Sequence, residues 1–145
     1  MIKVIDSFKK EPYRFLSNFY YCKVLYDELL YDSVEHAYQA AKTQHQEERE
    51  WIKSAKTPGE AKRRGQKITI KKDWEYVKLG VMSLLVKRKF KTPKLEEKLL
   101  ATGNAELIEG NYWHDTFWGV CNGKGENHLG KILMQVRKEK NHDNA

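Results

Sequence analysis

Apolar residues recur with a helical period along most of the chain, and this pattern predicts five helices. The longest uninterrupted segment, residues 33–54, contains no Pro or Gly, and its apolar positions 34, 37, 38 and 41 share one face. A second stripe, predicted to form the central core helix, consists of Trp74, Val77, Val81, Leu84 and Leu85 and continues to Phe90. The five predicted helices cover residues 33–54, 58–64, 74–90, 93–102 and 129–138.

Capping residues mark the ends of these helices. Ser33, Thr57 and Asp73 each stand where an N-cap is expected, and Pro58 occupies a first helical position with Glu60 completing a capping box. Glycines at positions 65 and 103 are typical helix stops.

Strand patterns are confined to the N-terminal third of the chain. Residues 2–5 predict a short strand, and residues 22–31 predict a hairpin that turns at Asp27-Glu28. The 145 residues contain no linker or repeat, so we expect a single α+β domain over 1–145, mainly helical with a small hairpin or sheet. The tail 138–145 is expected to fray.

The composition narrows the classes of partner. Lys and Arg outnumber Asp and Glu by 27 to 20, and the resulting net charge of +7 favours anionic partners such as phosphates, nucleotides or nucleic acid. No apolar run has the length of a membrane span and no signal peptide precedes the domain, which predicts a cytoplasmic protein with no membrane partner. Cys22 and Cys121 lack the spacing of a zinc site.

The first predicted helix places three polar side chains on one face. Glu35, Gln39 and Lys42 fall within about 60° of one another, with Tyr38 on their flank. This set is either an exposed polar stripe or the lining of a cleft beside the core. His36 is expected to be a hydrogen-bonded structural residue, and no metal is predicted because no second ligand has suitable spacing.

An aromatic segment, residues 112–119, surrounds one acid, Asp115. Its rings are either core anchors or a stacking platform for a ligand. Desolvation by these rings would raise the pKa of Asp115 and suit it to proton transfer, whereas its structural alternative is a capping role. The glycine-rich residues 122–130 are a weak signal for phosphate binding, and a plain turn is the alternative.

Taken together, these motifs resemble the NADAR, or YbiA-like, family. The matching segments occur in order along almost the whole chain: residues 15–19, 34–42, 72–74, 77–78, 82, 89–90, 117–119, 122–125, 127, 129–130, 133–134 and 137. The resemblance implies an orthogonal array of helices with a small sheet. It also implies an N-glycosidase that cleaves the bond between a ribosyl C1 and a nitrogen, without a cofactor.

Two substrate classes are associated with the family: phosphoribosylamino-pyrimidine intermediates of riboflavin biosynthesis, and ADP-ribose attached to guanine in nucleic acid. We favour the first because the chain is similar to the small stand-alone form. The partners expected are therefore a small phosphorylated ribosyl substrate and, as the alternative, ADP-ribosylated nucleic acid.

The resemblance also implies roles for individual residues. Its reaction centre would contain Glu35, Lys42 and Asp115. The substrate contacts that it implies are Asn18, Phe19, Tyr38, Gln39, Trp74, Trp118, Gly119 and Asn127. Either a carboxylate activates water, or Lys42 attacks C1 of the opened sugar to form a Schiff base, the route that the resemblance favours for ADP-ribosyl substrates.

A function of a different class is a non-catalytic module that binds nucleic acid through its positive charge and aromatic side chains. The charges are dispersed, however, and no RNP-type strand or helix-turn-helix pattern is present.

Overall fold

The computed structural model describes residues 2–143, which form a helix-rich α+β structure and thereby confirm the predicted fold class. The elements in chain order are β1 (Val4–Ile5), η1 (Arg14–Leu16), β2 (Val24–Tyr26), β3 (Leu29–Tyr31), α1 (Val34–Ala41), α2 (Gln46–Lys53), α3 (Pro58–Arg64), α4 (Trp74–Lys89), α5 (Pro93–Ala101), β4 (Glu106–Leu107), β5 (Gly110–Asn111), β6 (Val120–Cys121) and α6 (His128–Asp143). They form two compact units: the central unit, Asn18–Lys89, and the terminal unit, which combines the residues up to Ser17 with those from Phe90 onward.

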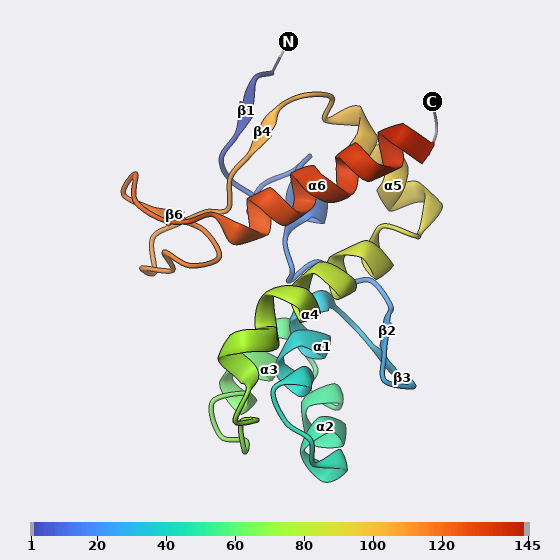
Figure 1. Cartoon of the computed structure of the whole chain (residues 1–145), viewed down its shortest axis with the longest axis vertical. Helices are drawn as coiled ribbons and strands as arrows, with labels where there is room; N and C mark the ends of the chain where they lie inside the picture. The colour runs from blue at the N-terminus through green and yellow to red at the C-terminus, as the bar shows by residue number, and fades with distance from the viewer. Residues whose placement is uncertain (1, 144–145) are drawn as a thin grey trace. The chain divides into compact units, whose positions relative to one another are not determined.

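The central unit is built around α1, which contacts α2, α3, α4 and the β2–β3 hairpin (Figure 1). Every residue of this helix is buried. Three alanines at positions 37, 40 and 41 leave room for its neighbours to approach closely. The predicted N-cap is confirmed, because Oγ of Ser33 accepts the backbone N–H of His36 at 3.0 Å.

The predicted helix over 33–54 is wrong in one respect, since it is interrupted between α1 and α2. Oγ1 of Thr43 accepts the backbone N–H of His45 at 3.1 Å, and the carbonyl of Lys42 accepts the N–H of Lys71 at 2.8 Å. These bonds replace the helical ladder, as expected where a threonine side chain competes for backbone groups.

The β2–β3 hairpin confirms the predicted turn. Val24 pairs with Tyr31 and Tyr26 with Leu29 in antiparallel register. Asp27 and Glu28 both have positive φ, 49° and 71°, as a two-residue turn of type I′ requires.

Helices α3 and α4 follow the predicted starts and stops, but the buried stripe of α4 differs from the predicted one. Leu84 is 37% exposed, whereas Met82, Leu85, Val86 and Lys89 are buried. The buried face of α4 therefore differs from the predicted face, because the packing of this helix on α1 and β2 decides which side chains are covered.

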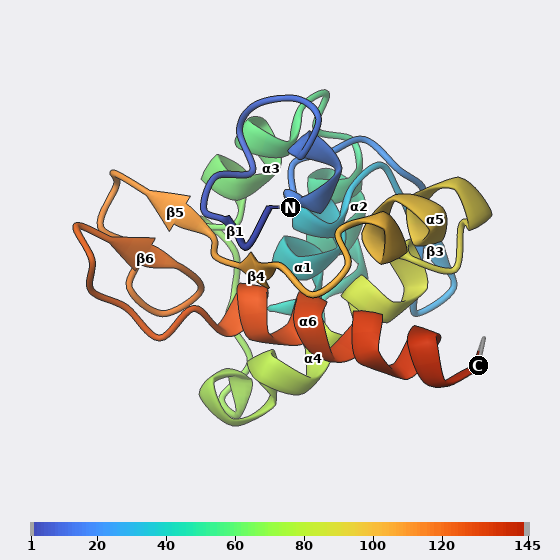
Figure 2. The same cartoon turned by 90° about the horizontal axis from the view of Figure 1, so that it is seen from above.

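In the terminal unit, β1 pairs with β4 and β5 pairs with β6, both in parallel register. Helix α6 contacts β4 and α5 and buries Leu129, Leu133 and Val136, while β5 and β6 run side by side (Figure 2). The predicted frayed tail is wrong over 138–143, because α6 continues to Asp143, and residues 144–145 lie outside the described part of the chain. Within residues 2–143, no helix combines the length and apolar character that a membrane span needs.

Candidate functional site

Glu35 is a buried ionisable residue of the central unit. It lies in the first turn of α1, is only 8% exposed, and its backbone N–H donates to the carbonyl of Asn18 at 3.1 Å. Its Oε2 accepts a hydrogen bond of 2.6 Å from Nε2 of Gln39, one turn further along the helix. The exposed-stripe alternative is therefore wrong, because Glu35 and Gln39 are both buried.

Burial raises the pKa of the Glu35 carboxyl above its ordinary value. The hydrogen bond from Gln39 and the positive charges of Lys62 and Lys42 oppose this shift without cancelling it. A carboxyl group in this state can hold a proton nearer to neutral pH and donate it, which suits a general acid.

Gln39 has a buried amide oxygen. The residue is 3% exposed, and its Oε1 has no hydrogen-bond partner among the described residues. Buried polar atoms are normally satisfied, so this unsatisfied acceptor is an uncommon feature beside Glu35. Gly65, at the end of α3, makes room for this amide, because a Cβ at position 65 would overlap Oε1 and Cδ of Gln39.

Lys42 caps the C-terminal end of α1 and is half-buried. Its Nζ lies 5.5 Å from the centroid of the Tyr38 ring. Burial lowers the pKa of its ammonium; Glu35 and Glu75 raise it, while the charges of Lys62 and Lys78 lower it further. A lysine with a lowered pKa has a larger neutral fraction and can act as a nucleophile.

The predicted aromatic contacts divide into buried and exposed side chains. Tyr38 and Trp74 are 6% and 5% exposed, and their rings pack against each other at 5.2 Å in a tilted arrangement. Phe19 is 42% exposed. The side chain of the neighbouring Asn18 donates to Sδ of Met82 at 3.5 Å. Tyr38 of α1 and Trp74 of α4 thus pack together as buried rings, whereas the ring of Phe19 is accessible.

His36 has the structural role that was predicted. Its Nδ1 lies 2.7 Å from Oγ of Ser33 and its Nε2 lies 2.9 Å from the carbonyl oxygen of Ala55. Both ring nitrogens are therefore used in tertiary hydrogen bonds. Among residues 2–143, no cluster of three or more His, Cys, Asp or Glu side chains has the arrangement of a metal site.

The remaining predicted site residues belong to the terminal unit, and several have clear structural partners there. Oδ1 of Asp115 accepts the backbone N–H groups of Phe117 and Trp118 at 3.2 and 2.9 Å, which is the capping alternative; its catalytic role stays a prediction. Oδ1 of Asn127 accepts the N–H of Glu109, and its amide group donates to the carbonyl of Leu107. These bonds fix the geometry of the segment before α6.

Local packing also accounts for Gly119 and for the glycine-rich turn. A Cβ at Gly119 would overlap the side chain and carbonyl of Glu109, so this position requires the close backbone approach that glycine allows. Cys121 and Lys124 exchange backbone hydrogen bonds of 2.9 and 3.0 Å around residues 122–123, both with positive φ. Residues 122–123 therefore form a turn, and phosphate binding by residues 122–130 stays a prediction.

The aromatic segment is more exposed than a set of core anchors would be. Tyr112 and Trp113 are 76% and 41% exposed, and Nζ of Lys9 lies 3.7 and 4.3 Å from their ring centroids. Trp118 is half-buried, with its ring 4.8 Å from that of Phe117.

Three residues of the central unit were missed as site components: Gly65, Lys62 and Lys78. The sequence analysis identified Gly65 only as a helix stop. Their influence on Gln39, Glu35 and Lys42 depends on the packing of α3 and α4 against α1, for which the local sequence carries no signal.

Comparison with known proteins identifies close similarity over nearly the whole chain. The family model described as the NADAR domain matches residues 7–140. A protein named N-glycosidase from Nostoc punctiforme is 39% identical over 136 residues, which cover 89% of this chain and 86% of that protein. The NMR structure of YbiA from Escherichia coli matches with a TM-score of 0.86 and 33% identity, covering 99% of this chain and 89% of that one.

Two longer relatives carry a different name. A riboflavin biosynthesis protein of Vibrio vulnificus is 38% identical over 89% of this chain, and a chloroplastic one of Zea mays is 39% identical over 78%. This chain spans only 36% and 20% of their respective lengths. The family match, the identities and the structural similarity agree, and the chain therefore belongs to the NADAR domain family.

Proposed function

We propose that this protein is an N-glycosidase that hydrolyses the ribosyl C1–N bond of a phosphoribosylamino-pyrimidine intermediate of riboflavin biosynthesis, releasing ribose 5-phosphate. The observation that carries this proposal is the buried face of α1. There, one carboxyl group with a raised pKa and one amine with a lowered pKa lie two turns apart on the same helix. Perturbed groups of this kind are concentrated in active sites.

The relatives support the reaction class and the substrate class. Similar proteins of comparable length are named N-glycosidases, and two longer ones are named riboflavin biosynthesis proteins. The positive charges of Lys62 and Lys78, which act on Lys42, favour a substrate that carries a phosphate.

In the proposed mechanism, Glu35 supplies the acid. Cleavage of a glycosidic C–N bond leaves negative charge on the departing nitrogen and positive charge on C1. Protonated Glu35 donates its proton to the leaving nitrogen. Gln39 orients the carboxyl through the hydrogen bond that its Nε2 donates to Oε2 of Glu35.

Lys42 is the proposed nucleophile. Its neutral amine adds to C1 of the ring-opened sugar, where C1 is bonded to the amine nitrogen as an imine. Glu35 protonates the nitrogen that was the imine, and a second proton passes to it from the lysine nitrogen. The C1–N bond to the heterocycle then breaks, so the heterocyclic amine leaves and Lys42 remains bonded to C1 as a protonated Schiff base. Water adds to C1, the C1–Nζ bond breaks, and the released proton returns to Glu35, which frees the sugar aldehyde and the neutral lysine. The alternative route, in which a carboxylate activates water directly, needs no covalent adduct.

Product analysis by mass spectrometry tests the proposal. The full chain is incubated separately with a phosphoribosylamino-pyrimidine and with DNA containing ADP-ribosylated guanosine. Release of ribose 5-phosphate supports the proposed activity, and release of ADP-ribose from the second substrate alone replaces it with the alternative substrate class. No product from either substrate, together with salt-dependent binding of single strands, would support the non-catalytic module instead.

A further inference from the structure

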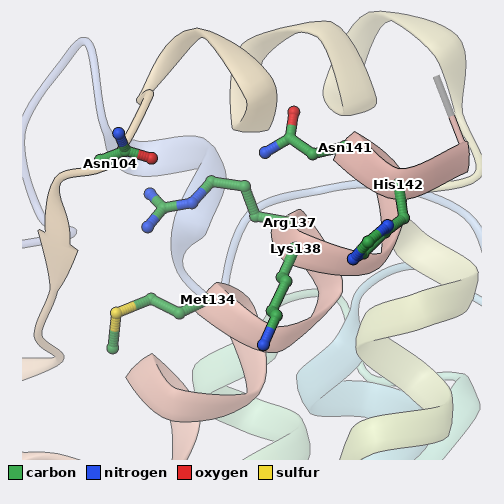
Figure 3. A pocket seen from close by; sticks show the side chains of 6 residues that line it. All are labelled: Asn104, Met134, Arg137, Lys138, Asn141 and His142. Carbon is green, nitrogen blue, oxygen red and sulfur yellow. The ribbon is translucent and has the colours of Figure 1, made fainter. Parts of the chain in front are cut away.

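The terminal unit contains an open hollow of about 480 Å³ that shares no residue with the proposed reaction centre. It is lined by Asn104, Met134, Arg137, Lys138, Asn141 and His142. Figure 3 shows that all of these except Asn104 project from α6, while Asn104 lies on the segment that joins α5 to β4.

Arg137 is the residue that makes this hollow unusual. It is 7% exposed, yet no carboxylate of the described residues lies within ion-pair distance of its guanidinium. Its two printed hydrogen bonds go to neutral acceptors, Oγ1 of Thr102 and the carbonyl of Ala105, both at 2.8 Å. A buried cation without an anionic partner is unfavourable, and a bound anion would compensate its charge.

The other polar groups of the lining also favour an anion. Lys138 adds an ammonium group and His142 an imidazole, and the amides of Asn104 and Asn141 can donate hydrogen bonds. Within residues 2–143, no carboxylate lines the hollow. Figure 3 shows the Arg137 guanidinium pointing toward Asn104 and Lys138 pointing away from it. A phosphate at Arg137 would therefore be bound by the guanidinium and an amide donor, and the charge of Lys138 would add a longer-range attraction.

The size and composition of the hollow indicate a small ligand. Its volume falls in the range of small-molecule sites, and Met134 supplies an apolar wall for the part of the ligand that carries the phosphate. Among the described residues, no Phe, Tyr or Trp lines it, so the large stacking surfaces that hold single-stranded nucleic acid are missing. We propose that this hollow is a second binding site, specific for a small molecule that carries a phosphate group.

The test is a titration of the ¹⁵N-labelled full chain, followed by NMR, with inorganic phosphate, ribose 5-phosphate and unphosphorylated ribose. Because it measures binding and not turnover, its outcome is independent of the proposed glycosidase activity. Saturable shifts of Arg137 Nε–H and of the Asn104 and Asn141 amide groups are expected with both phosphorylated ligands and not with ribose. Tighter binding of ribose 5-phosphate than of phosphate would show that the sugar contributes; equal affinity would assign the site to the phosphate alone.

Variants make the test specific. R137M is expected to weaken phosphate binding, followed at the Asn104 and Asn141 amide groups, by about tenfold or more, because it removes charge-assisted hydrogen bonds. Arg137 also donates hydrogen bonds to Thr102 and Ala105, so R137M can fail to fold. The double variant K138M/H142Q, which leaves these hydrogen bonds in place, is therefore titrated in parallel. The control is K94M, which removes one charge from an exposed position of α5 in the same unit and should bind as the parent does.

Three results would overturn the proposal. The first is the absence of any shift at these three groups with either phosphorylated ligand. The second is equal affinity of the K138M/H142Q variant and K94M for phosphate. The third is a response only to a single-stranded oligonucleotide, added in a parallel titration, which would identify the hollow as part of a nucleic-acid contact.

Discussion

The close contact between Gly65 and Gln39 predicts that the substitution G65A lowers both the free energy of unfolding and kcat. Gly65 has φ −61° and ψ −17°, a conformation that alanine adopts without strain, so G65A perturbs only the packing. A Cβ at this position would overlap the Gln39 amide, which is buried and donates a hydrogen bond to Glu35. The added methyl group must therefore displace Gln39 from the carboxyl.

The expected loss of stability follows from three contributions. Overpacking costs about 1–3 kcal/mol, and loss of the Gln39–Glu35 hydrogen bond costs about 1 kcal/mol. Replacing glycine with alanine restricts the unfolded chain and returns about 0.5 kcal/mol. The net expectation is a decrease of about 2 kcal/mol in the free energy of unfolding, with a fall in kcat of about 10-fold or more because the acid is misplaced.

Gly80 provides a matched control. It lies in the interior of α4, and a Cβ there would meet no atom within 4 Å. G80A should therefore stabilise the protein by about 1 kcal/mol and leave turnover unchanged. Urea denaturation of the two variants, followed by their rates of product release, measures both effects. Equal stabilisation by G65A and G80A, with parental turnover in both, would refute the role assigned to Gly65 and Gln39.

Further predictions concern three ionisable residues. Because burial raises the pKa of Glu35, the native protein holds a proton that the unfolded chain has released, so this group lowers stability as pH rises from 4.5 through its folded pKa. E35Q should therefore lose turnover yet gain stability over the parent between pH 4 and 7 in urea denaturation; a pH-independent difference would contradict the burial of this charge. Burial lowers the pKa of Lys89 to about 8, so the native amine is neutral between pH 8 and 10.5 while the unfolded one is charged. The stability of the parent relative to K89M should rise by roughly 3 kcal/mol over this range, from about 1.4 kcal/mol per pH unit, and parallel pH profiles would refute it. D115N retains an oxygen that can cap Phe117 and Trp118, so it should keep the parental Tm, whereas D115A should lose about 1 kcal/mol. A large loss of kcat in D115N at unchanged Tm would support the predicted catalytic role of Asp115. A parental kcat would contradict that role and leave Asp115 with its structural role as a cap.

Local signals predicted the elements that depend on neighbouring residues. The hairpin was evident because Asp27-Glu28 interrupts two short apolar runs, and α3 was bounded correctly because Thr57, Pro58 and Gly65 each act within one helical turn. The short strands β4, β5 and β6 were missed. Each has two residues, which is too short to show an alternating pattern. Their parallel pairings, β4 with β1 and β5 with β6, are set by tertiary packing.

The candidate site was predicted only in part for the same reason. Helical periodicity placed Glu35, Gln39 and Lys42 on one face, but periodicity alone could not decide whether that face was buried. The break after α1 also escaped prediction, because it depends on a hydrogen bond between Lys42 and Lys71, far apart in the sequence. The orphaned oxygen of Gln39 and the space left by Gly65 arise only when α3 packs on α1.

Borohydride trapping during turnover tests the central claim most directly. The parent protein and K42M are incubated with a phosphoribosylamino-pyrimidine and borohydride, and their peptides are mapped by mass spectrometry. The proposed mechanism predicts a substrate-dependent reduced adduct on Lys42 of the parent, and neither adduct nor product from K42M. Product release by K42M at the parental rate, with no adduct in either protein, would contradict the assignment of the reaction to this face of α1.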